Sequence, residues 1–467
     1  MSKKVEVAII GAGSAGLYAE SQVRKKTQDY VLINGGAHGT TCARVGCMPS
    51  KALIQIAHCY HERKHFADSG ISGAEHLSVD ISKVLDRVRS FRDRFVGGII
   101  SSSIDTLGEK RVDGYAKFID RNTLEVDGER IEAQKIIIAT GSTPIIPKEW
   151  ESFSDKLLTT DTIFEQKTLP KKIAVVGLGI IGLEIGQALS RLGIEVVGAS
   201  LGEKIAGIGD PEVNAKAIEL IGAEFPLWLG VPVELQECGD GIKLRSGDRE
   251  VVVDKVLVSL GRRAFLEHLG LENLGIELDV RGLPKYNKNT MQVEDLPIFI
   301  AGDVNGDRQI LHEAGDEGRI AGYNTVHSEI RSFKRKVPFG VVFSDPNIVF
   351  CGARYKEIES RDDTIVGRFD FKFHGRAVVM NKNAGILSLY VDKKDGLILG
   401  SEIIAPNAEH LAHHITWAIE QGLSVYELIK MPYYHPVIEE GLQAALIQCI
   451  KKIGVHKEGI LESYFLD

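Results

Sequence analysis

The chain has 467 residues, of which 56 are Lys or Arg and 64 are Asp or Glu, so its formal net charge is −8 at pH 7. This length predicts about three domains. A net negative chain does not attract phosphate backbones or anionic lipid surfaces, so we expect no nucleic-acid partner and no membrane role. Hydrophobic residues at 44% and charged residues at 26% are typical of a folded globular protein with a large core.

The N-terminus places Lys3 and Lys4 before an apolar run, as a signal peptide does, but Glu6 interrupts the run and glycines end it. We interpret this segment as a strand that enters a loop. No stretch reaches the roughly 18 apolar residues of a transmembrane helix, so a cytoplasmic protein is expected. The six cysteines are too few for a disulfide scaffold, so any pair among them should be redox-active.

Two segments, residues 3–20 and 170–189, have the same form. Each holds a run rich in Val and Ile, the pattern G-x-G-x-x-G and a helical pattern, and a second apolar strand follows. In such a βαβ unit the glycines allow a tight turn, close approach to a pyrophosphate, and close packing of helix on strand. The repeat therefore predicts two dinucleotide sites. The glycines are Gly11, Gly13, Gly16, Gly177, Gly179 and Gly182.

Further apolar strands at 135–141 and 298–304 end in small residues, and prolines between 144 and 170 indicate a crossover. From about residue 337, strand-like runs precede two helical patterns, which is typical of an α+β domain. We expect an α/β fold with two doubly wound Rossmann-type dinucleotide-binding domains, the second inserted in the first, and a C-terminal α+β domain. The predicted segments are 1–149 and 266–336 for the first domain, 150–265 for the second, and 337–467 for the third.

Cys42 and Cys47 follow the first unit and precede Pro49 and Lys51. On an ideal helix their side chains would point about 140° apart, so a bond between them needs a distorted turn, for which Gly46 provides the freedom. In a reducing compartment a disulfide that closes so short a loop is more often catalytic than structural. Two free cysteines near a helix start explain the spacing equally well.

Seven motifs resemble those of the flavin-dependent pyridine nucleotide-disulfide oxidoreductases, the family of dihydrolipoamide dehydrogenase, glutathione reductase and mercuric reductase. They occur in the family's order and span nearly the whole chain. The resemblance implies FAD on the first unit, NAD(P)H on the second, a redox-active Cys42–Cys47 disulfide against the flavin, and a homodimer formed by the C-terminal domain. The motifs are GAGSAG, CARVGC followed by PSK, IIIATG, GLGIIGLE, SLGRR, IFIAGDV and HPVIEE.

The resemblance also implies the roles of single residues. Cys47 faces the flavin and Cys42 exchanges with a dithiol or disulfide substrate. His435 is the base that serves the partner subunit's disulfide, and Glu440 orients its ring. By spacing alone, His435 is a surface histidine before a proline.

Lys51 and Glu184 match a pair of the family that lies beside the flavin, where a cation stabilises reduced FAD. Taken alone, each is an ordinary charged residue on a helix surface. Asp303 matches the acid that binds the ribityl and pyrophosphate region, and a helix N-cap is its other interpretation. The other cofactor-binding residues implied by the resemblance are Thr41, Gly114, Thr140, Gly141 and Gly261.

The sequence departs from the family at the acid expected to bind each adenosine ribose, where Asn34 and Ser200 stand instead. An asparagine oxygen still accepts from a ribose hydroxyl. Ser200 removes the repulsion that excludes a 2′-phosphate, but no arginine follows it and only Lys204 is near. Gly182 favours NADH by resemblance, so NAD(H) is expected as the preferred cofactor, with NADP(H) as the alternative.

Two further departures concern the substrate: Tyr433 stands where dihydrolipoamide dehydrogenases usually have a histidine, and Arg44 replaces an asparagine. Three interpretations of Arg44 are open: it lowers the pKa of a cysteine, it binds an acidic group of the substrate, or it is a solvated surface residue. We expect dihydrolipoamide as substrate, carried by a lipoyl domain of a 2-oxoacid dehydrogenase complex. The alternatives are a glutathione-like or protein disulfide, or a flavoprotein redox sensor or binding subunit whose disulfide is inert.

Histidines recur at helical spacing in two segments, but no carboxylate or closed ligand set accompanies them. A partly exposed helix face explains both groups, and we expect no metal site. The histidines are His58, His61, His65, His410, His413 and His414.

Overall fold

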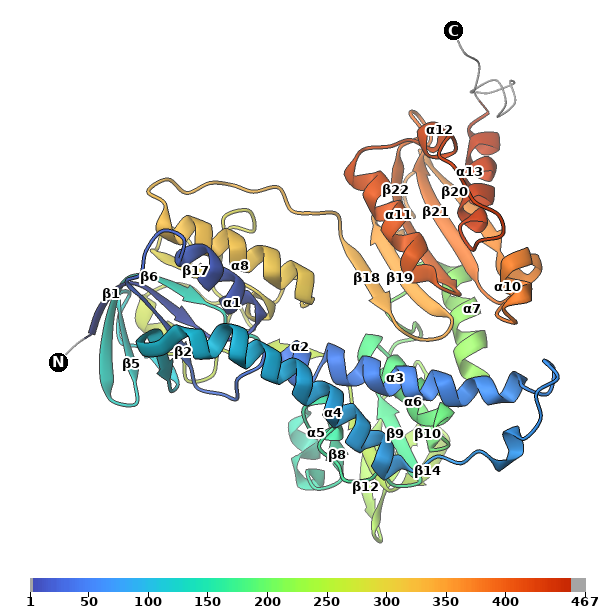
Figure 1. Cartoon of the computed structure of the whole chain (residues 1–467), viewed down its shortest axis with the longest axis horizontal. Helices are drawn as coiled ribbons and strands as arrows, with labels where there is room; N and C mark the ends of the chain where they lie inside the picture. The colour runs from blue at the N-terminus through green and yellow to red at the C-terminus, as the bar shows by residue number, and fades with distance from the viewer. Residues whose placement is uncertain (1–2, 455–467) are drawn as a thin grey trace.

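The computed structural model describes residues 3–454 and shows three domains (Figure 1). The first is built on a seven-stranded sheet in the order β3-β2-β1-β6-β5-β4, with β17 paired to β6. Strands β1, β2, β3, β6 and β17 pair in parallel. Their bounds are β1 Lys3–Ile10, β2 Tyr30–Asn34, β3 Arg111–Asp113, β4 Ala116–Phe118, β5 Thr123–Val126, β6 Glu129–Ile138 and β17 Ile298–Ile300.

Helices α1 (Ser14–Val23) and α8 (Leu311–Val326) pack side by side on this sheet (Figure 1). Both β17 and α8 come from the chain segment that follows the second domain, so two distant segments complete one fold. The apolar runs of β1, β2 and β6 form its core because parallel strands covered on both faces have to be buried throughout.

The second domain has a parallel sheet in the order β11-β10-β9-β15-β8, with helix α6 (Ile180–Arg191) after β9 and α7 (Pro211–Gly222) after β10. A three-stranded antiparallel sheet adjoins it. The antiparallel pair β7 (Ser142–Pro144) and β16 (Arg262–Ala264) lies where the chain enters and leaves this domain. The other strands are β8 Leu157–Leu158, β9 Lys172–Val176, β10 Glu195–Ser200, β11 Leu227–Leu229, β12 Glu234–Cys238, β13 Gly241–Ser246, β14 Arg249–Val253 and β15 Lys255–Val258.

The two glycine patterns have the same backbone geometry. Gly11 has a φ of +110° and Gly177 a φ of +97°, both in the region that favours glycine. A Cβ atom at Gly16 would overlap the carbonyl oxygen of Gly11, and one at Gly182 would overlap that of Gly177. The third glycine of each pattern therefore lets the helix lie against the first turn, as the repeat predicts.

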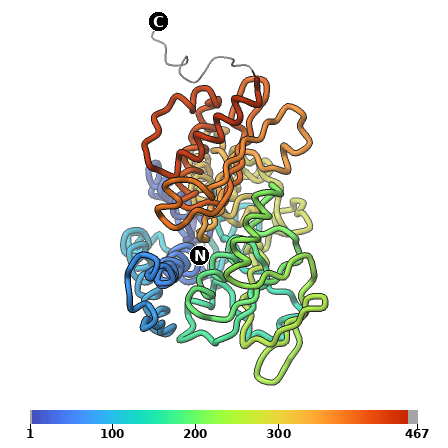
Figure 2. Tube along the Cα trace, turned by 90° about the vertical axis from the view of Figure 1, so that its right-hand side faces the viewer, coloured from blue at the N-terminus to red at the C-terminus, as the bar shows by residue number. Residues whose placement is uncertain are grey.

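The C-terminal domain is an antiparallel sheet in the order β18-β19-β22-β21-β20, covered by α11 (Ala408–Glu420) and α13 (Glu440–Ile453). It lies at one end of the molecule (Figure 2). This α+β domain completes the predicted fold, which is confirmed. Its other elements are β18 Phe339–Val342, β19 Asn347–Gly352, α9 Tyr355–Ile358, β20 Thr364–Asp370, α10 Gly375–Val379, β21 Ile386–Asp392, β22 Ile398–Ala405 and α12 Val425–Leu428.

Two helices join the domains: α3 (Cys47–His61) packs on α4 (Ile81–Ile99) and on α6 of the second domain, below the C-terminal sheet (Figure 1). A residue near the start of α3 can therefore meet all three domains. Across residues 3–454, the search for a helix that is both long and apolar enough to cross a bilayer finds none.

Candidate functional site

The two cysteines of the CARVGC segment lie on separate helices. Cys42 belongs to the short helix α2 (Thr41–Arg44), and Cys47 is the first residue of α3. Between them Val45 and Gly46 leave helical geometry, with φ and ψ of −133° and 0° for Val45 and −114° and −112° for Gly46. The distorted turn that the spacing demands is present, so the two sulfurs can meet.

Both cysteines are half-buried free thiols, and they differ in acidity. The hydrogen bond from Cys42 to Cys47, helped by the Lys51 cation, lowers the pKa of Cys47 to about 7. The same hydrogen bond, together with burial, raises the pKa of Cys42 well above its ordinary value. Cys47 is therefore the sulfur favoured as a thiolate, and Cys42 is the one favoured as a thiol.

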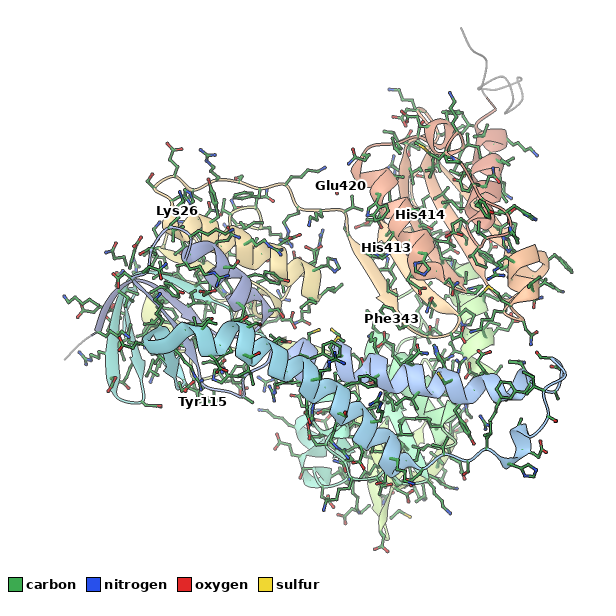
Figure 3. The ribbon with its side chains drawn as sticks, viewed as in Figure 1. Lys26, Tyr115, Phe343, His413, His414 and Glu420 are labelled. Carbon is green, nitrogen blue, oxygen red and sulfur yellow. The ribbon has the colours of Figure 1, made fainter. Side chains whose placement is uncertain are left out.

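A partly buried ion pair lies one helical turn beyond Cys47. The Lys51 Nζ lies 2.7 Å from Oε2 of Glu184 on α6, whose side chain is only 3% exposed. The other oxygen of Glu184 accepts the backbone N–H of Phe343 at 2.9 Å, and the Phe343 ring lies 4.8 Å from the Lys51 Nζ. Figure 3 shows Phe343 where the C-terminal domain meets α3. Glu184 of the second domain and Phe343 of the C-terminal domain thus hold Lys51 beside the thiols.

His435 and Glu440 form a second pair, with Nδ1 of the ring 2.9 Å from Oε1 of the carboxylate. The other carboxylate oxygen accepts the Val437 N–H at 3.1 Å. The hydrogen bond to His435 lowers the pKa of Glu440, so this carboxylate stays ionised and holds the ring. The His435 side chain is 79% exposed and is available to a second chain.

A cavity of about 190 Å³ opens at the first glycine pattern. Asn34 lies in its wall, and its Oδ1 accepts the Ala12 N–H at 3.1 Å. A Cβ atom at Gly11 would overlap the carbonyl oxygen of Ala139, so only glycine allows the glycine loop to lie this close to the end of β6. This cradle at the N-terminus of α1 fits the pyrophosphate and adenosine of a dinucleotide. The predicted residues that line it are Gly11, Gly13, Asn34, Thr41, Gly114, Thr140 and Gly141.

Asp303 lies outside the residues that line this cavity. It is the first residue of a short 3₁₀ turn whose N-cap is Gly302, so the N-cap interpretation of Asp303 is wrong. Its carboxylate accepts the Ser142 hydroxyl at 2.7 Å, and the Arg262 Nε donates to the same hydroxyl at 2.8 Å. Sequence analysis missed Ser142 and Arg262, although each lies within or beside a motif of the resemblance.

The predicted second dinucleotide site lies at the ends of β9 and β10. Gly179 is the N-cap of α6, as Gly13 is of α1. Ser200 is the last residue of β10, and its carbonyl oxygen accepts a hydrogen bond from the Gly230 N–H at 3.0 Å. The Lys204 Nζ donates to the Gly209 carbonyl at 3.1 Å. Gly261, with a φ of +103°, follows β15, where the chain returns to the first domain.

The histidine groups do not converge on a ligand site. Burial lowers the pKa values of His58 and His61, and His65 lies beyond the end of α3. His413 and His414 lie on the face of α11 (Figure 3). Within residues 3–454, no group of three His, Cys, Asp or Glu side chains is placed to hold a metal ion.

The fold and the site define a protein with two dinucleotide-binding folds and a cysteine pair beside the first of them. Residues 5–318 match the family model for pyridine nucleotide-disulphide oxidoreductases, and residues 338–446 match the model for that family's dimerisation domain. The chain therefore belongs to this family, whose members use FAD and NAD(P)H and form homodimers.

Its relatives include the dihydrolipoyl dehydrogenase of Geobacillus stearothermophilus, 30% identical over 94% of each chain. The leghemoglobin reductase of Vigna unguiculata is 30% identical over 98% of this chain and 90% of that protein. Among solved structures, the HOCl-induced flavoprotein disulfide reductase RclA of Escherichia coli has a TM-score of 0.84 at 23% identity, covering 96% of this chain and 99% of its own. LpdA of Mycobacterium tuberculosis has a TM-score of 0.83 at 21% identity, over 95% and 99%. At these identities the two structures establish the fold alone.

Proposed function

We propose that the protein passes electrons between NADH and dihydrolipoamide through FAD and the Cys42–Cys47 pair. The observation that carries this proposal is the position of the two cysteines, which end up next to each other across the break at Gly46 and one helical turn from the Lys51–Glu184 ion pair. The lowered pKa of Cys47 and the raised pKa of Cys42 agree with it. Thiol–disulfide exchange needs one stabilised thiolate and one sulfur that reacts with substrate. The similarity to dihydrolipoyl dehydrogenases over 94% of the chain supports dihydrolipoamide as the dithiol.

FAD, when bound, exchanges a hydride with the nicotinamide and an electron pair with a thiolate. In dithiol oxidation, one substrate sulfur attacks Cys42 of the disulfide, the bond to Cys47 breaks, and Cys47 leaves as a thiolate. The second substrate sulfur then attacks the first, so the substrate leaves as a disulfide and Cys42 is released. Two electrons have passed to the cysteine pair.

His435 takes the proton that the attacking dithiol must lose. Glu440 holds Nδ1 of its ring, so Nε2 is the free nitrogen. Since the His435 side chain is exposed on its own chain, we assign it to the disulfide of the partner subunit. Lys51 compensates the charge of the Cys47 thiolate and of the reduced cofactor, and Glu184 holds it in place.

NADH is the proposed nicotinamide cofactor, with NADPH as the alternative. The Lys204 ammonium, the cation nearest to Ser200 in sequence, is directed to the Gly209 carbonyl. It therefore offers less to a 2′-phosphate than a free lysine would.

Steady-state turnover of the purified protein with lipoamide, oxidised glutathione and a panel of small and protein disulfides tests the proposal. The highest kcat/KM is expected for lipoamide, and Cys42→Ser should remove this turnover while NADH still reduces the flavin. A higher kcat/KM for another disulfide would replace the substrate assignment. Flavin reduction without turnover of any disulfide would favour a redox sensor or binding subunit.

A further inference from the structure

Arg44 lies in the cavity at the first glycine pattern, among Gly11, Gly13 and Thr41. It is the last residue of α2 and is partly buried. Although it stands between the two cysteines in sequence, the charges that act on the pKa of Cys47 are those of Lys51 and Glu184. The side chain therefore belongs to the dinucleotide cradle and not to the thiol pair.

The donors of Arg44 are largely unused. Its one hydrogen bond runs from Nη1 to the Ala37 carbonyl at 3.4 Å, which is long for such a bond. Within residues 3–454 Arg44 forms no ion pair, whereas Arg89 and Arg111 each pair with a carboxylate. A partly buried guanidinium with free N–H groups is suited to bind an anion, because its planar fork matches two oxygens of a phosphate.

The charge balance of the cavity indicates the same ligand. Arg44 is the sole Lys or Arg among the described residues that line it, and Glu267 is the sole acid. A dinucleotide pyrophosphate carries two negative charges. The N-terminus of α1 provides only about half a positive charge through its dipole. A full cation beside the glycine loop therefore neutralises pyrophosphate charge that the helix leaves uncompensated.

We propose that Arg44 binds the pyrophosphate of FAD and thereby sets the affinity of the protein for this cofactor. The inference rests on the proposed function, which places FAD in this cavity. It assigns to Arg44 a cofactor contact in place of the three roles open to it from sequence: tuning a cysteine, binding an acidic substrate, or facing solvent.

The test measures the Kd of FAD by flavin fluorescence on dilution of the holoprotein, at low and high KCl. Arg44→Asn should raise this Kd about 10- to 100-fold at low salt, the usual worth of a charge-assisted hydrogen bond, and the difference should shrink at high salt. Arg44→Lys should lose less, because it keeps the charge but not the fork. Arg87→Asn is the matched control, since this exposed arginine on α4 lies over Phe91 and its loss changes the net charge equally.

Competition of ADP and of adenosine with FAD for rebinding shows which part of FAD Arg44 contacts, because ADP contains the pyrophosphate and adenosine does not. Arg44→Asn should weaken ADP as strongly as FAD and leave adenosine unchanged. An unchanged FAD Kd in Arg44→Asn, or an equal loss of adenosine affinity, would overturn the assignment. Wild-type protein that does not bind FAD would instead refute the proposed function itself. A thermal unfolding transition of Arg44→Lys that matches the wild type would show that substitution at this position does not unfold the protein.

Discussion

Cys42 and Cys47 are the same residue type in different surroundings. The proton that Cys42 donates to Cys47, together with the nearby Lys51, separates their pKa values. Burial alone would raise both values. The contact between the two sulfurs and the Lys51 cation one helical turn from Cys47 together favour Cys47 as the thiolate.

The first prediction concerns this thiolate. Two-electron reduction of the FAD-loaded protein should produce a long-wavelength absorbance from Cys47 lying against oxidised flavin. Cys42→Ser should show the band without reductant, and Cys47→Ser should lack it. Because the pKa of Cys47 falls from 9.0 to about 7, the band should grow as the pH rises through about 7, and the stability that the contacts give the thiolate should be lost as the pH falls through the same value. Spectra of all three proteins across this pH range test the band, and thermal unfolding over the same range tests the stability. Unchanged spectra in both variants would show that the sulfurs are misassigned.

The second prediction concerns Ser200. The wild type should prefer NADH over NADPH by only a small factor, because no carboxylate stands where a 2′-phosphate would lie. Ser200→Glu should sharpen the preference through like-charge repulsion, which costs several kcal/mol. Values of kcat/KM for both cofactors check this, with Ser200→Gln as the uncharged control. A wild type that favours NADPH tenfold would reverse the cofactor assignment.

The short helix α2 depends on an unusual N-cap. Thr40 has a φ of +62° and a ψ of +149°, a region that side chains with a branched Cβ rarely adopt. Its hydroxyl accepts the Ala43 N–H at 3.2 Å, which caps the helix that carries Cys42. Strain and capping act in opposite directions at this one residue.

The third prediction separates these two effects. Thr40→Gly relieves a strain of about 1–3 kcal/mol and loses a few tenths of a kcal/mol of capping, so the apparent Tm should rise. Thr40→Ala keeps the strain and loses about 1 kcal/mol of capping, so the apparent Tm should fall. Thermal unfolding of the three holoproteins checks the two signs, and a glycine variant less stable than the alanine variant would contradict the backbone assignment.

At the scale of the whole molecule, the C-terminal domain exposes His435, the proposed base, together with apolar side chains. Tyr434, beside His435, is 80% exposed, and Phe373 and Trp417 are also largely exposed. An exposed apolar surface of this kind is suited to the contact between two chains, and the match to the family's dimerisation domain supports a homodimer.

The fourth prediction tests whether the active sites are shared between subunits. His435→Gln should leave flavin reduction by NADH nearly intact and lower disulfide turnover about 10²- to 10⁴-fold, the usual worth of a positioned base. Glu440→Gln should have a milder effect because it only orients the ring. A heterodimer of Cys42→Ser and His435→Gln chains should regain one working site, with activity approaching half that of the wild type. Heterodimers that form but stay inactive would mean that His435 serves its own subunit or is not the base.

The glycine repeat is a feature that the sequence determined by itself. Each glycine meets a local steric demand, a positive φ or a close approach of helix to turn, and such demands act within one βαβ unit. The same holds for the break at Gly46, whereas the pairing of His435 with Glu440 followed from the family resemblance and not from their spacing. The two nucleotide-binding folds and the position of the cysteine pair could therefore be predicted.

The electrostatics of the site were decided only by the tertiary structure. Lys51 and Glu184 meet because α3 packs on α6, and Asp303 binds Ser142 because distant segments share one sheet. From the sequence, Arg44 was interpreted as part of the cysteine loop, but the packing of α2 places its side chain in the dinucleotide cavity. Burial and long-range partners set pKa values and charge neutralisation, and neither is encoded in the spacing of residues along the chain.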